Sequence, residues 1–433
     1  RPTPASTVSP PFPRRQTRPA KRVRSPPPIP RADLLVYDRS FWFAYLANTS
    51  LMIAVSLLFR YSDFIHLLGG SELQLGWIVG VGAVGSLLMR LAQGVGIDRY
   101  GPRKIWLISL LAVIVTLFLH IWVTRVDTPG IYFLRAAYHT GLAGAFGASI
   151  TYIARRAPVI RMAELIGMLG SSGFVGMIVG TQLGDFLCRA EPLSRFHLDR
   201  LFLVAAAVAT CSLLAAWLAT RGESRPVRRK RLPTLWIVRR YHPGKLILMG
   251  LMMGIGVGLP GTFLRPFAES LGISTIGTFF GVYAVTAFGL RMATRRLPER
   301  IGIRPTILLG MVCLAGSLLL YLVVQSPWQL AIPAVVAGAA HALLFPSVVA
   351  GCSQTFPDRY RGLGTTLGLG AFDLGNLIGM PISGSLVYAA DQAGLPGYPV
   401  LFVSLAALLL LFSGYYAIGV AGRQGQSRLA RVR

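Results

Sequence analysis

Apolar runs of about twenty residues recur along almost the whole chain, and this pattern limits its fold more than any other feature. A helix of that length crosses the hydrocarbon core of a bilayer, which is about 30 Å thick. Only 14% of the residues are charged, against about 25% in soluble domains, so most of the surface faces something other than water. The sequence therefore predicts an all-α, multi-pass membrane protein with twelve spans. They lie at roughly 41–60, 75–97, 105–124, 130–154, 162–187, 200–220, 246–268, 275–294, 305–325, 328–355, 362–388 and 397–420.

Lysine and arginine gather on one side of these spans. Of the 43, 34 lie in the two termini and in the loops on the same side. Six lie on the opposite side: Arg60, Arg125, Arg189, Arg195, Arg200 and Arg265. The positive-inside rule then predicts a protein of the cell (inner) membrane with both termini in the cytoplasm. Basic segments there attract anionic lipid headgroups, so lipids rather than nucleic acid are the expected partners of the net charge of +27.

A polar stretch halfway along the chain separates the sixth and seventh predicted spans. It divides the chain into two predicted six-helix bundles, 39–221 and 246–421, joined by a basic cytoplasmic linker at 222–245. Residues 1–38 are rich in proline and arginine and are expected to be a disordered cytoplasmic tail. Residues 422–433 form a second basic tail.

The two bundles share residues at a nearly constant spacing. An offset of 201 pairs Arg90 with Arg291 and Gly101 with Gly302. Charged residues inside or beside spans rarely coincide by chance, so the pairing indicates an internal repeat of two halves in the same orientation. Many transporters are built from such repeats and bind their solute at the midplane between them.

The turn between the second and third predicted spans has the sequence GVGIDRYGPRK. Its charges and glycines are Gly94, Asp98, Arg99, Gly101, Arg103 and Lys104. This pattern resembles the signature loop of the major facilitator superfamily, and a degenerate second copy, RRLPERIGIRP, stands at 295–305. The resemblance covers essentially all of 40–420. It implies twelve transmembrane helices in two pseudo-symmetric six-helix bundles and the activity of a secondary transporter.

Both copies of the loop are candidates for a conformational latch. Asp98 is expected near the positive end of a neighbouring helix dipole, and the bases near carboxylates of adjacent helices or lipid phosphates. Such contacts would hold the outward-facing state. The second copy contributes Glu299, Arg300, Gly302 and Arg304. The alternative is an anchor that only sets the orientation in the membrane through its charge.

Glycines at four-residue spacing predict close packing of two helices against their neighbours. They and a nearby proline are Gly176, Gly180, Gly184, Gly375, Gly379 and Pro381. The segment GMIVGTQLGD in the fifth span also resembles the pattern of proton-linked efflux members, G-x-x-x-G-P-x-x-G-G. It departs from that pattern with Thr181 at the proline and Asp185 at the last glycine.

Ionisable residues inside spans are costly and therefore candidates for coupling or solute binding. They are Arg90, Arg135, His139, Asp185, Arg291, His341 and Asp373. Arg135 resembles the helix-four arginine of the superfamily, and His139 and His341 occupy matching positions of the two halves. Asp373 is the one carboxylate predicted near a mid-span, where it could carry a proton. It could instead pair permanently with an arginine or with His341, or contact the solute.

We therefore expect a secondary transporter of a small solute that works by alternating access, with proton-coupled efflux favoured over proton-coupled uptake. A transporter-like sensor or scaffold and a membrane-embedded enzyme are the rivals from other classes. The sequence contains no catalytic triad, no metal-ligand cluster and no phosphate-binding loop of the Gly-Lys-Ser/Thr type, and the four cysteines are scattered. No metal or cofactor is expected. The few charges in the spans favour a neutral, amphiphilic or singly charged solute.

Overall fold

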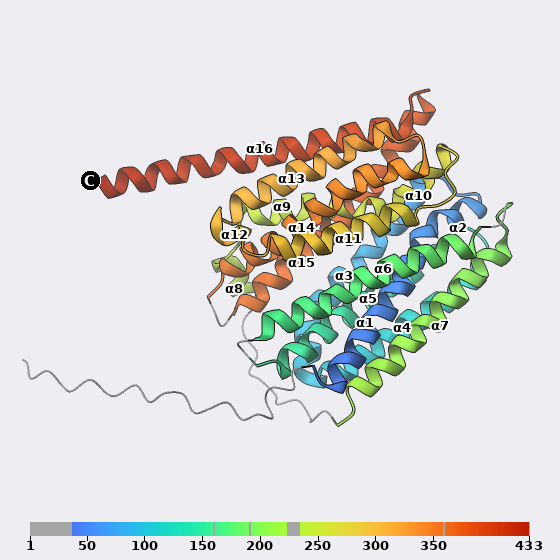
Figure 1. The fold of residues 1–433 in the computed structure, drawn as a ribbon, viewed down its shortest axis with the longest axis horizontal. Helices are drawn as coiled ribbons and strands as arrows, with labels where there is room; N and C mark the ends of the chain where they lie inside the picture. Colours follow the sequence, from blue (N-terminus) through green and yellow to red (C-terminus); the bar gives the residue numbers. More distant parts are fainter. Residues whose placement is uncertain (1–36, 159–160, 190–191, 223–233, 358–359, 433) are drawn as a thin grey trace, which may run out of the picture. The chain divides into compact units, whose positions relative to one another are not determined.

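The computed structural model describes residues 37–158, 161–189, 192–222, 234–357 and 360–432, and the regular elements in these ranges are helices. The chain from Tyr37 onward forms one compact unit. The first half contains α1 (Arg39–Leu57), η2 (Leu58–Arg60), α2 (Tyr61–Leu67), α3 (Glu72–Tyr100), α4 (Pro102–Leu119), η3 (His120–Trp122), α5 (Pro129–Arg156), α6 (Met162–Leu187) and α7 (Arg195–Ala219). The two halves are drawn in blue to green and in yellow to red (Figure 1).

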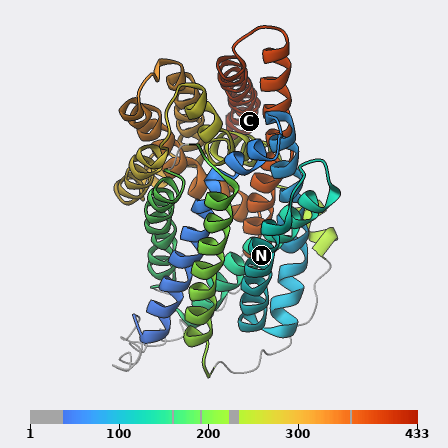
Figure 2. The same ribbon diagram turned by 90° about the vertical axis from the view of Figure 1, so that its right-hand side faces the viewer.

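The second half follows the same order of helices. It contains α8 (Thr234–Arg240), α9 (Lys245–Gly258), α10 (Pro260–Ser270), α11 (Gly277–Ala293), α12 (Leu297–Arg300), α13 (Ile303–Leu320), η5 (Tyr321–Val323), η6 (Pro327–Leu330), α14 (Ala331–Gln354), α15 (Arg361–Gln392) and α16 (Gly397–Val432). The short α8 lies in the predicted linker, and α12 lies in the second copy of the signature loop. Figure 2 shows the helices of the first half side by side along their length.

Nine helical segments of the described chain are long and apolar enough to cross a membrane. The other three predicted spans coincide with α5, α11 and α15. These helices pack against several neighbours at once, α5 between α3 and α4 and α15 between α3, α9 and α14. A helix that faces protein on most sides can carry more glycine and polar residues than one that faces lipid. The interior positions of α5 and α15 therefore account for their weaker apolar signal, whereas α11 is shorter, with 17 residues.

The internal repeat is visible in which helices touch. In the first half α1 packs on α6 and α7, and α5 packs on α3 and α4. In the second half α9 packs in the same way on α15 and α16, and α14 packs on α11 and α13. The halves meet through α3 against α15 and α11 against α6, which are equivalent pairs under the repeat. The structure thus has two pseudo-symmetric bundles joined at a pseudo-symmetric interface.

Glycines allow the closest of these contacts. A Cβ at Gly176 would lie 2.6 Å from the carbonyl oxygen of Thr49 on α1, and one at Gly180 equally close to that of Ile53. Gly375 and Gly379 face α9 in the same way, and a Cβ at Gly379 would lie 2.8 Å from Cγ1 of Ile255. The six predicted packing positions differ in how close their contacts are and in which helix they contact. Gly184 has only ordinary contacts with Leu57 and Arg60, whereas Pro381 packs against Gly80 across the interface between the halves.

Candidate functional site

A buried ionic network ties the two halves together at one end of the helices. We call this end, defined by Arg60, Asp63, Asp185 and Arg265, the network end. The opposite end, which carries the turns at Gly101 and Gly302, we call the motif end. The carboxylate of Asp63 on α2 accepts a hydrogen bond from Nε of Arg60 and another from Nε of Arg265 on α10, each 2.8 Å long. The three side chains are 1%, 3% and 9% exposed, so the charges are almost fully removed from solvent. One carboxylate thereby links both halves.

Asp185, at the end of α6, completes the network by binding the start of a helix in the other half. Its Oδ2 accepts hydrogen bonds from the backbone N–H groups of Ile276 (3.0 Å) and Gly277 (2.7 Å), where α11 begins. Its Oδ1 accepts from Nη1 of Arg60 at 3.2 Å, and Nη2 of Arg60 donates to the carbonyl oxygen of Ser274. The first N–H groups of a helix lack partners within the helix and favour an anion. The network therefore contains two negative carboxylates and two positive guanidiniums, and their charges sum to zero.

Arg90 and Asp373 form a second link between the halves, from α3 to α15. Both Nε and Nη2 of Arg90 donate to the carboxylate, Nη2 at 3.4 Å from Oδ1. The partner of Asp373 is thus an arginine. His341 has a different contact, because its Nδ1 lies 2.6 Å from the hydroxyl of Tyr283 on α11.

The repeat-related position has a different chemistry. An offset of 199 aligns Asp373 with Phe174 on α6, and Arg291 is the counterpart of Arg90. The guanidinium of Arg291 lies 5.1 Å from the ring centre of Phe174, a cation–π contact, and its Nε has no hydrogen-bond partner in the described part of the chain. The two equivalent helix pairs therefore carry an ion pair at one interface and a cation–π contact at the other.

Arg135 on α5 lies between two tyrosines. Its guanidinium carbon is 4.2 Å from the ring centre of Tyr61 and 5.2 Å from that of Tyr138. The residue is 7% exposed, and its Nε and Nη1 lack hydrogen-bond partners among the described residues. His139 is adjacent, with its ring 5.6 Å from that of Tyr138. A buried guanidinium with free donors can bind an acceptor supplied by a solute.

The signature-loop residues lie at the motif end. Gly101 and Gly302, which precede α4 and α13, have φ angles of 85° and 94°, a conformation that other residues rarely adopt. The side-chain surroundings of Gly94 and Asp98 fall outside the described residues. Arg99 stacks on the ring of Tyr100 at 5.2 Å.

The other predicted latch residues are distributed over the loop and its second copy. They are Arg103 and Lys104 in the first turn of α4, Glu299 and Arg300 in α12, and Arg304 in the first turn of α13. Glu299 and Arg304 border a hollow that Lys245 and Arg295 also line. The latch stays a prediction.

Three members of the ionic network were missed by sequence reasoning. The sequence analysis counts Arg60 and Arg265 among the bases of the outer side, near the outer ends of the first and seventh predicted spans. The helices continue to Leu67 and Ser270, and both arginines are buried in them. Asp63 lies past residue 60, where the first predicted span ends, and the same extension of the helix buries it. A signal was present, because an offset of 202 aligns Asp63 with Arg265, an acid with a base.

Comparison with known proteins identifies the family of this fold. The sequence profile of the Major Facilitator Superfamily matches residues 40–324 and 246–427. Multidrug resistance protein MdtG of Citrobacter koseri is 23% identical over 407 residues, covering 89% of this chain and 95% of that protein. The protein of the same name from Dickeya zeae is 26% identical over 342 residues, covering 73% and 77%.

Solved transporter structures share the fold. The nucleoside transporter NupG superposes with a TM-score of 0.69 at 14% identity, covering 89% of this chain and 98% of that one. A D-xylose-proton symporter superposes with a TM-score of 0.66 at 16% identity, covering 87% and 96%. At these identities the likeness concerns the fold alone.

Proposed function

Because the chain belongs to the Major Facilitator Superfamily, a family of transporters and not of enzymes, we propose that it expels a small solute in exchange for protons. It is a multi-pass integral membrane protein whose family moves small solutes. The observation that carries the proposal of proton coupling is the Arg90–Asp373 ion pair between the halves. The likeness to MdtG, named a multidrug resistance protein, supports efflux over uptake.

A carboxylate paired across a moving interface can couple proton binding to conformation. Protonation of Asp373 removes the charge that holds Arg90, so the contact between α3 and α15 loosens. Loss of the proton restores the ion pair. The repeat-related pair, Arg291 and Phe174, cannot exchange a proton in this way, because a phenyl ring has no titratable group. Coupling would therefore reside at one of the two equivalent interfaces, with Asp185, His139 and His341 as reserve candidates for the proton carrier.

The proposed solute site uses the free guanidinium donors of Arg135 and Arg291. Arg135 is buried and Arg291 is half-buried, and Nε and Nη1 of Arg135 and Nε of Arg291 have no hydrogen-bond partner among the described residues. A solute that offers a carbonyl, phosphoryl or carboxylate oxygen would satisfy these donors. This favours a neutral or singly anionic amphiphile over a cation.

The proposed topology places the network end outside the cell and the motif end with both termini in the cytoplasm. The basic hollow at the motif end, lined by Lys245, Arg295 and Arg304, suits anionic lipid headgroups. In this structure the ionic network closes the network end, which is the proposed outer end. Alternating access would require Arg265 and the start of α11, both in the second half, to separate from Asp63, Arg60 and Asp185 in the first half when that end opens.

The test uses vesicles that contain the purified protein, an imposed pH gradient, and the Asp373→Asn variant. We expect solute to cross the membrane of wild-type vesicles in the direction opposite to that of the protons. We expect the variant to exchange solute down its own gradient but to lose pH-driven movement. Asp127→Asn is the matched control, because it neutralises an exposed acid of the α4–α5 loop.

Three results would change the interpretation. Persistent pH-driven transport in Asp373→Asn would show that this residue is not the proton carrier. Movement of solute in the same direction as protons would favour uptake by symport. Absence of any solute exchange, while solute binding is kept, would favour the sensor or scaffold.

A further inference from the structure

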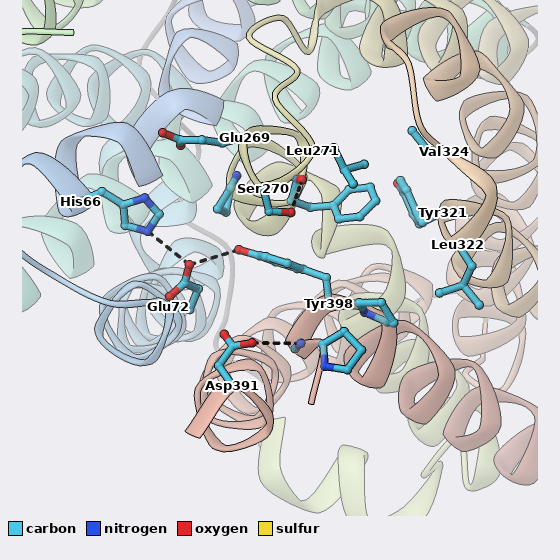
Figure 3. Close-up of a pocket in the computed structure, with 15 residues that line it drawn as sticks. His66, Glu72, Glu269, Ser270, Leu271, Tyr321, Leu322, Val324, Asp391 and Tyr398 are labelled. Atoms are coloured by element: carbon cyan, nitrogen blue, oxygen red, sulfur yellow. Dashed lines mark hydrogen bonds and ion pairs between the residues drawn. The ribbon is translucent and has the colours of Figure 1, made fainter. Parts of the chain in front are cut away.

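A pocket of about 560 Å³ opens at the network end, with walls from both halves. His66 on α2 and Glu72 on α3 come from the first half, and the remaining lining residues come from the second (Figure 3). Its size lies within the range of about 300–1,000 Å³ found for small-molecule sites. Because both halves form its walls, the pocket exists in this form only while the network end is closed.

The acidic and basic side chains that line the pocket are three carboxylates and one histidine, His66, whose Nε2 lies 3.7 Å from Oε1 of Glu72. Glu72, Glu269 and Asp391 contribute three carboxylates, and the described lining residues include no lysine or arginine. Arg265 reaches Glu269 only loosely, with Nη2 3.8 Å from Oε2, and the Glu269 side chain is 53% exposed. Oδ1 of Asp391 accepts a hydrogen bond from the backbone N–H of Gly397 at 3.0 Å. A concave acidic surface raises the local concentration of cations.

Aromatic rings form another part of the wall. The ring of Phe267 lies 5.7 Å from that of Tyr321 and 5.6 Å from that of Tyr398, and all three line the pocket. Rings grouped in this way provide both apolar surface and a negative π-face for a cation. An inorganic ion would use only the carboxylates, and the described residues contain no group of three histidine, cysteine or acidic side chains placed to hold a metal ion.

The hydroxyl of Tyr321 is a second observation that points to a ligand. Tyr321 is 2% exposed, yet its hydroxyl has no hydrogen-bond partner in the described part of the structure. The residue lines the pocket, and Figure 3 shows its hydroxyl turned toward Leu271. Tyr398 differs, because its hydroxyl donates to Oε1 of Glu72 at 3.2 Å. The free oxygen of Tyr321 can accept a hydrogen bond from an N–H group.

We propose that this pocket binds an organic amine in its protonated form, with an apolar body, taken from the medium at the network end. The ammonium group lies among Glu72, Glu269 and Asp391, and the body lies against the rings. Since the walls belong to both halves, the bound amine stabilises the closed network end and slows its opening. The effect on transport rests on the proposed alternating access, whereas binding itself does not.

Binding is tested on the full chain in detergent with dansylcadaverine, a fluorescent primary amine, and its neutral N-acetyl derivative. We expect saturable binding of the amine and at least tenfold weaker binding of the acetylated compound. Asp391→Asn and Tyr321→Phe should each weaken amine binding several-fold, because they remove one charge or one hydroxyl and keep the shape. Asp127→Asn, an acid outside the pocket at the same end, should leave it unchanged. Equal affinity for both compounds, or full affinity in Asp391→Asn, would overturn the proposal.

The position is tested with Ser270→Cys, a pocket residue, in a background without the four native cysteines. We expect dansylcadaverine to protect this cysteine from a membrane-impermeant maleimide added at the network end, and to slow solute transport from that side. In Asp391→Asn, both effects should require a several-fold higher concentration of dansylcadaverine. Protection without any transport would contradict the transporter proposal alone. Unprotected cysteine in a protein with normal pH-driven transport would contradict the amine site alone.

Discussion

At the scale of single residues, Asp63 holds the most consequential position. Its carboxylate binds Arg60 in its own half and Arg265 in the other, and it is 1% exposed. Breaking a buried ion pair by removing one partner costs about 3–5 kcal/mol, because the other charge is left uncompensated. Here two guanidiniums would lose their shared partner. The closed network end therefore depends on this side chain more than on any exposed pair.

We expect Asp63→Asn to favour opening of the network end. The native Cys188, which follows α6 and is 6% exposed, reports on this opening. Its rate of modification by a small thiol reagent added at the network end should rise at least tenfold in Asp63→Asn, measured at constant pH by mass spectrometry. Asp127→Asn should show the wild-type rate. Unchanged modification of Cys188 in Asp63→Asn would mean that the network does not hold this end closed.

The pH dependence of Cys188 is a further prediction at this scale. Burial raises the pKa of this thiol from 9.0 to about 11, so the folded protein keeps it protonated near neutral pH. Only the thiolate reacts. A pKa that is two units higher leaves about a hundredfold less thiolate at pH 8 than an ordinary cysteine has. The modification rate in the folded protein should therefore keep rising up to about pH 11. In denatured protein it should level off above pH 9. A plateau near pH 9 in the folded protein would contradict the burial of this thiol.

At the scale of elements, the contact between α3 and α15 depends on glycine. A Cβ at Gly384 would collide with the carbonyl oxygen of Glu72, and one at Gly76 with that of Met380. Backbone atoms cannot move aside as a flexible side chain can. The Arg90–Asp373 ion pair lies between the same two helices, so their spacing also sets the geometry proposed for proton coupling.

We expect Gly384→Ala to separate α3 from α15 and to lower the free energy of unfolding by about 1–3 kcal/mol, the usual cost of overpacking. Gly370→Ala, on the same helix, is the matched control, because a Cβ there meets nothing within 4 Å. The measurements are thermal unfolding in detergent and pH-driven transport in vesicles. Equal melting temperatures and rates for the two variants would refute the close contact.

At the scale of the whole molecule, the equivalent contacts of the two halves argue for motion of one bundle against the other. The interface consists of two repeat-related helix pairs, α3 with α15 and α6 with α11. Each half has its own packed helices, so it can move as a body. The Asp63–Arg265 and Arg90–Asp373 ion pairs cross that interface and would change with the motion.

The predicted topology is tested with single cysteines in a background without native ones. We expect Arg228→Cys, in the linker, to resist an impermeant maleimide added to intact cells, because 34 of the 43 basic residues lie on the predicted cytoplasmic side. Asp127→Cys, in the loop at the network end, should be modified from outside. Modification of Arg228→Cys in intact cells would show that the linker lies outside the cell and that the predicted topology is wrong.

The sequence alone determined the membrane class, the twelve spans, the two halves and the family, because hydropathy, charge bias and spacing are properties of the chain read in one dimension. The spacing of 201 residues, for example, pairs Gly101 with Gly302, and both glycines adopt a positive φ in the structure. Only the tertiary structure decided that Asp373 pairs with Arg90 rather than His341, and that Asp63 joins Arg265, 202 residues away. These partners depend on the rotation of each helix about its axis and on where each helix ends in a bundle. A few residues more or less at the end of a span, as at Arg60, convert a charge expected at the outer surface into a buried one.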